Sequence, residues 1–412
     1  MRTMQENEVI TFGCRLNAFE TEVIRRAAAA AGLKGAIIIN TCAVTAEAER
    51  QARQAIRRAR RDHPGAKIIV TGCAAEIDPQ RYAALPEVDR VLGNRAKLWA
   101  HSYLSVESEA PDVDEPAAHL VDGFQGRSRA FVQVQQGCDH RCTFCIIPYA
   151  RGANRSVPMG VIFEQANRLV DAGYHEIVLT GVDLTAYGGD LPGTPRLGQM
   201  ARRLLAAVPK LERLRLSSLD PVEIDADLWR LLAEEPRLMP HLHLSLQAGD
   251  DLILKRMKRR HSRADAITVA RRAHALRPDL ALGADLIAGF PTETEAMFRQ
   301  SVNLIQECQL AFVHVFPYSP RSGTPAARMP PVASSVVKER AARLRKAGES
   351  ALVAELESRV GSESDVLIER PGTGRAAFYG VVDFTGSAPV GSVQRMRLVD
   401  CDGRRLVGVP IQ

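Results

Sequence analysis

Short runs of β-branched and other apolar residues alternate with helical patterns through the first quarter of the chain. The runs at residues 9–12, 36–40 and 67–71 predict parallel strands that are buried on both faces, because few polar positions interrupt them. Between the second and third runs, residues 45–61 repeat apolar positions with the period of an amphipathic helix. This rhythm predicts a small doubly wound α/β domain over residues 1–104.

The middle of the chain, residues 124–350, repeats the alternation of strand and helix six times. Six βα units predict an incomplete parallel barrel, two units short of a closed eight, with a lateral opening for a large substrate. In the fourth strand the leucines share one face and the polar residues, Gln247 among them, share the other. We interpret the polar face as the wall of a cavity; the alternative is an edge strand with one solvated face. The six strands are predicted at residues 131–135, 176–180, 213–217, 241–247, 282–288 and 312–317.

The two ends of this barrel region change in character. Residues 105–123 contain an acidic, proline-broken stretch without an apolar period, which is typical of a linker. Residues 351–412 lose the helical pattern from about Val366 and carry Gly, Pro and Asp turns between short strands. They predict a small antiparallel β-barrel with strands at residues 366–368, 376–384, 393–399 and 405–410.

Composition limits where the protein works and how its cysteines are used. The 412 residues contain no apolar run near the ~20 residues of a membrane helix, and the first residues lack the apolar core of a secretory signal. We therefore expect a cytoplasmic protein with no membrane contact. In that reducing compartment the eight cysteines are expected to be metal ligands, catalytic groups or buried small residues, not disulfides. The net charge of +6 is compatible with a nucleic-acid partner.

Three cysteines follow the first barrel strand with the spacing C-x3-C-x2-C. Cys138, Cys142 and Cys145 can hold three corners of one 4Fe–4S cluster and leave the fourth iron open for chemistry. This loop, with Phe144 before its last cysteine, resembles that of the radical S-adenosylmethionine (SAM) enzymes, in which SAM occupies the fourth iron. The alternative is a structural zinc site, but His140 is too close in sequence to complete one.

Other residues lie at the ends of later barrel strands, where a βα barrel places its ligands. Gly181 and Val182 follow the second strand and resemble the glycine-containing segment of that superfamily near the methionine end of SAM. Ser217, Gln247 and Gly289 occupy the ends of the third, fourth and fifth strands, and Gly289 would permit close approach of its backbone to a ligand. Together with Phe144, these residues are predicted to bind SAM. Each segment alone can also be explained as a turn followed by a helix cap.

Cys14, Cys42 and Cys73 each lie just past one predicted strand of the first domain. Ligands gather beyond the carboxyl ends of strands in open α/β sheets, and neighbouring strands are only ~4.8 Å apart. We therefore predict that these three thiols bind a second 4Fe–4S cluster. The alternative is three unrelated buried cysteines.

The order of these parts resembles the radical SAM methylthiotransferase family over nearly the whole chain. The resemblance implies an auxiliary 4Fe–4S cluster in the first domain, a radical SAM barrel, and a carboxyl-terminal RNA-binding domain called TRAM. It also implies two molecules of SAM, one as methyl donor and one as source of a 5′-deoxyadenosyl radical, and an electron donor such as flavodoxin or ferredoxin. The runs at residues 40–45, 145–152 and 314–319 resemble the branch that modifies N6-threonylcarbamoyladenosine.

This branch acts on the adenosine next to the tRNA anticodon, position 37, and adds a 2-methylthio group. Arg151 and Arg155 are our candidates for the carboxylate of the threonylcarbamoyl group; the alternative is a phosphate or surface contact. The basic runs at residues 50–61 and 255–260 fit RNA contact or, by default, a solvated helix face. Other possible functions are methylthiolation of isopentenyladenosine in tRNA, methylthiolation of an aspartate of a ribosomal protein, and electron transfer without catalysis.

Overall fold

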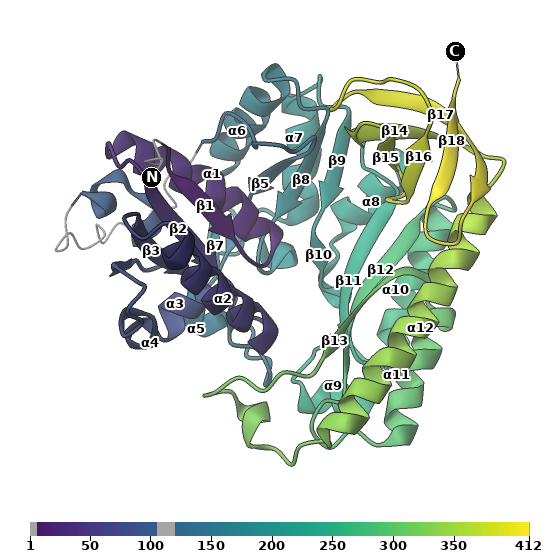
Figure 1. The fold of residues 1–412 in the computed structure, drawn as a ribbon. Coiled ribbons are helices and arrows are strands. Elements are labelled where there is room, and N and C mark those ends of the chain that lie inside the picture. Colours follow the sequence, from purple (N-terminus) through teal and green to yellow (C-terminus); the bar gives the residue numbers. More distant parts are fainter. Residues whose placement is uncertain (1–5, 105–119, 412) are drawn as a thin grey trace.

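The computed structural model describes residues 6–104 and 120–411, which form an amino-terminal sheet domain, a central barrel and a small carboxyl-terminal barrel (Figure 1). Most of the predicted linker, residues 105–119, lies outside the described residues. The α/β class and the three-part order agree with the prediction.

The amino-terminal domain is a parallel sheet with helices on both faces. Ile38 and Ile69 pack against Ile24 of helix α1 (Arg15–Ala30) on one face. Ile37 and Ile68, one position earlier on the same strands, pack against Ile56 of α2 (Ala46–Asp62) on the other. This alternation confirms a doubly wound arrangement. The strands, in their spatial order, are β1 (Glu8–Thr11), β2 (Ala36–Thr41), β3 (Lys67–Gly72) and β4 (Arg90–Val91). Short helices α3 (Cys73–Ile77) and α4 (Pro79–Ala83) lie between β3 and β4 in the chain, and η1 (Ala96–Leu98) and η2 (Ala100–Tyr103) follow β4.

The central barrel contains the six predicted βα units. Two parallel sheets, ordered β5-β8-β9 and β10-β11-β12-β13, meet where β9 passes into β10 with only Ser217 between them. The strands are β5 (Ala130–Gln133), β8 (Glu176–Thr180), β9 (Arg213–Leu216), β10 (Ser218–Leu219), β11 (His241–Gln247), β12 (Ala281–Ala288) and β13 (Leu310–Pro317). The outer helices are α6 (Met159–Asp171), α7 (Leu197–Ala207), α8 (Ala226–Glu234), α10 (Arg263–Leu276), α11 (Glu295–Glu307) and α12 (Ser334–Arg359).

Strands β5 and β13 are the edges of this open barrel. The amino-terminal domain lies beside the β5 edge, where Phe19 and Val23 of α1 join the hydrophobic core of the barrel (Figure 1). The loops near the site carry the short elements α5 (Ile147–Arg151), α9 (Asp251–Arg256), η3 (Leu184–Ala186), η4 (Pro221–Glu223), η5 (Pro325–Arg328) and the antiparallel pair β6 (Gln135–Gln136) and β7 (Arg155–Ser156).

The carboxyl-terminal domain is a closed five-stranded barrel in the order β14-β15-β16-β18-β17. It corrects two predictions. The pairing of β16 with β18 is parallel, so the barrel is not antiparallel throughout. The strand predicted at residues 376–384 is two strands, because the chain turns at Tyr379, whose φ is 81°. The strands are β14 (Glu363–Arg370), β15 (Thr373–Ala376), β16 (Val381–Phe384), β17 (Val393–Cys401) and β18 (Leu406–Pro410).

Helix α12 connects the two barrels without a break. The predicted domain boundary between residues 350 and 351 falls inside this helix, and the β-barrel begins only at Glu363. Two arginines of β9 hold the domains together: Arg213 donates to the carbonyl of Asp365 (3.0 Å), and Arg215 donates to the carbonyl of Ala376 (3.0 Å). The carboxyl-terminal barrel is therefore fixed to the base of the central one.

Candidate active site

The three amino-terminal cysteines meet at the carboxyl edge of the first sheet. Cys42 and Cys73 directly follow Thr41 and Gly72, which are partners in the pairing of β2 with β3. The loop that carries Cys14 touches Cys42, since a Cβ at Gly13 would lie 2.7 Å from the Sγ of Cys42. Burial, with further contributions from the neighbouring Cys14 and Cys73, raises the pKa of Cys42 to about 11. Cys42 and Cys73 are buried and Cys14 is exposed. Clustered thiols of this kind fit a metal cluster, because a bound cation stabilises their thiolate forms.

Beneath this edge lies a buried ionic network, and it overturns the predicted substrate contact of Arg151. Its guanidinium donates to Glu20 (2.8 and 3.0 Å), to Asn17 (2.6 Å) and to the Sγ of Cys73 (3.2 Å). Only 2% of the side chain is exposed, and its hydrogen-bond partners are protein groups, so the guanidinium is buried away from a substrate carboxylate. Arg151 instead links helix α1, through Asn17 and Glu20, to Cys73.

Glu20 forms ion pairs with two buried cations, Arg151 and Lys97. Lys97 donates to it at 2.7 Å, and both partners are buried. Burial alone would raise the pKa of Glu20, but Arg151 and Lys97 outweigh it and lower the pKa to about 2.

Replacing Glu20 with Gln should therefore leave two buried cations without compensation. We expect Glu20→Gln to lower the free energy of unfolding by roughly 3–5 kcal/mol, measured by denaturant titration of the anaerobically reconstituted protein. The matched control is Glu22→Gln on the same helix, whose partner Arg25 is one-third exposed, so the change should stay below about 1 kcal/mol. Equal losses in the two variants would contradict the assigned importance of the buried network.

The second group of cysteines lies on the loop between β6 and α5. The Cys138 thiol donates to Asp183 (3.6 Å), and Arg259 donates to the Sγ of Cys142 (3.8 Å). Burial raises the pKa of Cys145 to about 11 and, with the charge of Asp183, also raises that of Cys138. These three thiols thus share one partly buried loop beside an arginine, a setting that fits an iron–sulfur cluster.

Arg259 was not predicted as a site residue. The sequence placed it in a basic run that could face phosphate, yet its side chain is 8% exposed and also donates to Asp220 and to the carbonyl of Ser245, both at 2.8 Å. Nothing in the local pattern separates it from its exposed neighbours Lys258 and Arg260. Its contact with Cys142, which is 117 positions away in sequence, forms only in the folded chain.

Gln135 links the predicted SAM segment to the cluster loop, and it too escaped sequence analysis. Its Oε1 accepts from the backbone N–H groups of Val182 and Asp183, both at 2.9 Å, and its Nε2 donates to the carbonyl of Gly137 (2.7 Å). A Cβ at Gly181 would lie 2.7 Å from the same Oε1, so glycine is required there. Residues 181–183 are therefore locked to the loop that carries Cys138.

The other predicted SAM residues are Phe144, Ser217, Gln247 and Gly289. Phe144 and Gln247 line a cavity beside the cluster loop, and the buried Oγ of Ser217 has no hydrogen-bond partner within the described structure. At Gly289 a Cβ would lie 2.6 Å from Val337 of α12, so the absence of a side chain there allows close packing of this helix, and the contact of Gly289 with SAM stays a prediction.

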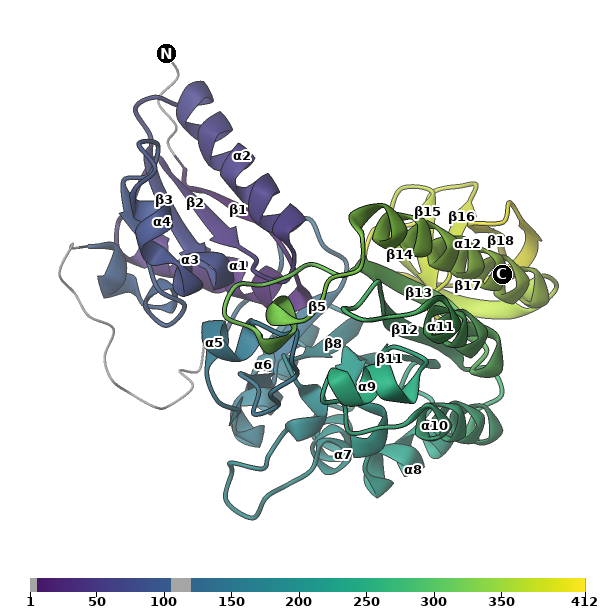
Figure 2. The same cartoon turned by 90° about the horizontal axis from the view of Figure 1, so that it is seen from below.

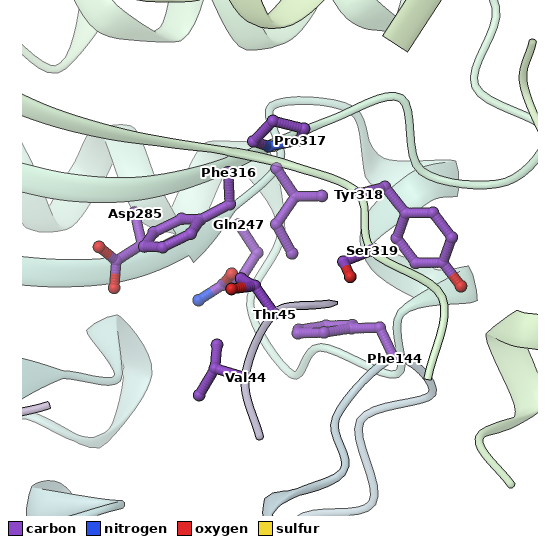
Figure 3. A pocket seen from close by; sticks show the side chains of 10 residues that line it. Val44, Thr45, Phe144, Gln247, Asp285, Phe316, Pro317, Tyr318 and Ser319 are labelled. Atoms are coloured by element: carbon purple, nitrogen blue, oxygen red, sulfur yellow. The ribbon is translucent and has the colours of Figure 1, made fainter. Parts of the chain in front are cut away.

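This cavity, of about 200 Å³, is lined by residues that neighbour both groups of cysteines in the chain, and Figure 3 shows its lining side chains. Val44 and Thr45, two and three positions after Cys42, form one wall, and Phe144, which directly precedes Cys145, forms another. The remaining lining residues come from the last three barrel strands and the loops that follow them: Gln247, Asp285, Ile287, Phe316, Pro317, Tyr318 and Ser319. A reactant in this cavity would contact residues that lie within three positions of Cys42 and of Cys145 in the chain.

Arg155 is not among the residues that line this cavity. It lies on β7, pairs with Gln136 of β6, and donates to the carbonyl of Arg151 at 3.1 Å. The structure therefore does not bring the two predicted carboxylate-binding arginines to the cavity.

Comparison of the sequence with known proteins shows the family to which the chain belongs. Residues 132–305 match the radical SAM superfamily, and residues 7–93 match an uncharacterized protein family, UPF0004. The chain is 50% identical to the threonylcarbamoyladenosine tRNA methylthiotransferase MtaB of Rickettsia prowazekii, over 97% of this chain and 96% of that protein. The chain belongs to the radical SAM methylthiotransferase family. The predicted cofactors, SAM and 4Fe–4S clusters, are those of this family.

Other members of the family are more distant. The protein of the same name from Bacillus subtilis is 37% identical, over 81% of this chain and 78% of that one. The tRNA-2-methylthio-N6-dimethylallyladenosine synthase of Erythrobacter litoralis is 33% identical, over 97% and 96%. Among solved structures, the radical SAM methyltransferase TsrM of Kitasatospora setae shares the fold, with a TM-score of 0.56 and 14% identity over 78% of this chain and 75% of that one. No described helix is long and apolar enough to cross a membrane.

Proposed function

We propose that this protein is the tRNA methylthiotransferase that converts N6-threonylcarbamoyladenosine at position 37 to its 2-methylthio derivative. The observation that carries the proposal is the cavity lined by Val44, two positions after Cys42, and by Phe144, directly before Cys145. Methylthiolation needs both a radical source and a sulfur source at one substrate carbon, and this arrangement offers one place where both can act. The relatives that bear this activity in their names support the choice of substrate.

In this proposal the two groups of cysteines have separate roles. Cys138, Cys142 and Cys145 hold the cluster that binds SAM, and Cys14, Cys42 and Cys73 hold the auxiliary cluster. When bound, these groups supply the carbon radical, the methyl group and the sulfur that replace an unactivated C–H bond by a thioether. The chain's own residues orient them: Gln135 fixes the segment 181–183 to the cluster loop, and Arg259 holds Cys142 next to Asp220 and Ser245.

The tRNA is expected to approach along α2 and the open side of the barrel. Thr45, the cap of α2, lines the cavity, and from there the helix extends away from the centre of the molecule (Figure 2). Arg57, Arg58 and Arg61 are exposed along its outer part, where they can meet phosphates. Arg60 is committed instead to Asp89 at 2.6 Å and to nearby carbonyls. The proposal also includes RNA binding by the TRAM-like barrel and an electron donor such as flavodoxin or ferredoxin. It places the protein in the cytoplasm.

The substrate can be tested with purified, anaerobically reconstituted enzyme. We expect methylthiolation of tRNA that carries threonylcarbamoyladenosine at position 37 to exceed that of isopentenyladenosine tRNA by about three to five decades in kcat/KM, because polar groups that match a polar substituent are left unpaired by an apolar one. Mass analysis of the digested nucleosides gives the rates. Comparable rates on both RNAs would contradict the branch assignment. Activity on neither, with activity on the ribosomal-protein aspartate, would replace the substrate altogether.

A further inference from the structure

Two histidines and one aspartate form a cluster on the inner face of the barrel, on three consecutive strands. His243 of β11 lies 2.8 Å from the Oδ1 of Asp285 on β12, and His314 of β13 lies 3.2 Å from the same oxygen through its Nδ1. Asp285 and His314 are direct partners in the pairing of the two strands, and the two imidazole rings are 4.6 Å apart. Gly283 makes room for this arrangement, since a Cβ there would lie 2.5 Å from His243.

This cluster adjoins the cavity of the proposed active site. Asp285 lines the cavity, and Phe316, which shares a strand face with His314, lines it too (Figure 3). No lysine or arginine is among the residues that line the cavity. Asp285 stays ionised: burial alone would raise its pKa, but hydrogen bonds and charge from His243 and His314 outweigh burial and lower it.

The two histidines differ in what they can offer to a ligand. The ring of His243 is buried, with only 6% of the side chain exposed, and its Nε2 is committed to Asp285. The side chain of His314 is 56% exposed, and Asp285 contacts its Nδ1. Asp285 therefore orients the ring of His314 through Nδ1, and Nε2 is not needed for that contact.

We propose that His314, held by Asp285, binds the carboxylate of the threonylcarbamoyl group of the substrate. The inference rests on the proposed function and deepens it. An anionic substituent in this cavity needs a cationic partner, and Arg151, Arg155 and the lining residues do not provide one. With hydrogen on both ring nitrogens, His314 donates its Nδ1–H to Asp285 and can donate its Nε2–H to the substrate carboxylate in a charge-assisted hydrogen bond. Asp285 is the positioning residue, and His314 makes the contact.

The inference can be tested by RNA binding, independently of turnover. Fluorescence anisotropy would measure the Kd of the reconstituted enzyme for anticodon stem–loops that carry threonylcarbamoyladenosine or its neutral carboxamide analogue. The wild-type enzyme should bind the carboxylate form about tenfold more tightly or better, since hydrogen bonds to charged groups have this magnitude. His314→Leu should bind both stem–loops equally, with the Kd for the carboxamide little changed.

The matched control is His175→Leu. His175 forms the same kind of pair, with Glu212 at 2.9 Å, on the outside of the barrel, so this variant should keep the wild-type preference. Iron content and melting temperature report whether either variant has lost its fold.

The inference is overturned if the wild type does not distinguish the carboxylate from the carboxamide, a result that needs no variant. It is also overturned if His314→Leu keeps the preference. Either outcome leaves the proposed function standing when the wild-type enzyme still methylthiolates threonylcarbamoyladenosine tRNA. Failure of that reaction would reject the proposed function itself.

Discussion

Replacing Cys138, Cys142 and Cys145 together with alanine is expected to halve the iron content and abolish cleavage of SAM. The reconstituted wild type should carry about eight irons in two cubanes, and the triple variant about four. The reason is that each cubane needs its own three thiolates, and no other cysteine among the described residues lies on this loop. Iron analysis and chromatographic detection of 5′-deoxyadenosine provide the two measurements.

A control for this experiment is the double replacement of Cys308 and Cys401 with alanine. Cys308 is part of the hydrophobic core of the central barrel, and Cys401 packs against the core of the carboxyl-terminal one. Their loss should leave both iron content and SAM cleavage unchanged. Full iron content in the variant that lacks Cys138, Cys142 and Cys145 would show that these residues do not hold a cluster.

Replacing Cys14, Cys42 and Cys73 with alanine is expected to separate the two halves of the reaction. Reductive cleavage of SAM should continue, because the loop between β6 and α5 keeps its cysteines and their partners Asp183 and Arg259. Methylthiolation should fall below detection, because the sulfur source is lost. About four irons should remain.

The measurement compares 5′-deoxyadenosine with methylthiolated nucleoside in one reaction mixture. The replacements leave Val44 and Thr45 in place, two and three positions after Cys42, so the cavity wall that they form can persist in the variant. If the variant loses SAM cleavage while its remaining cluster is spectroscopically intact, the two cysteine groups do not have separate roles.

Much of the fold follows from local patterns in the sequence. The β-branched runs of β2 and β3, buried on both faces, are typical of a parallel sheet, and the six repeats of strand and helix lead to an open parallel barrel. The places of the six cysteines follow in turn, because residues just past parallel strands must gather at one edge of the sheet. Spacing alone puts Cys138, Cys142 and Cys145 on one loop.

The branch of the family was predicted from short runs, and the structure shows why those runs carry information. Thr45 and Ser319, which belong to two of them, lie in the cavity wall. They meet across domains, where the N–H of Ala46 donates to the hydroxyl of Ser319 at 3.1 Å. Segments that touch a substrate are the ones that differ between enzymes with different substrates.

Tertiary structure alone decided which charged side chains serve the site. Arg151 and Arg259 look like ordinary basic residues in the sequence, yet each is buried with partners that lie 131 and 39 positions away, Glu20 and Asp220. Tyr379 is a similar case: it turns the chain between β15 and β16 and stacks on His241 of the central barrel at 4.4 Å. The sequence determined the strands and the cysteine positions because periodicity and spacing are local. The pairing of buried charges depends on which distant segments the fold brings together, and no local pattern records it.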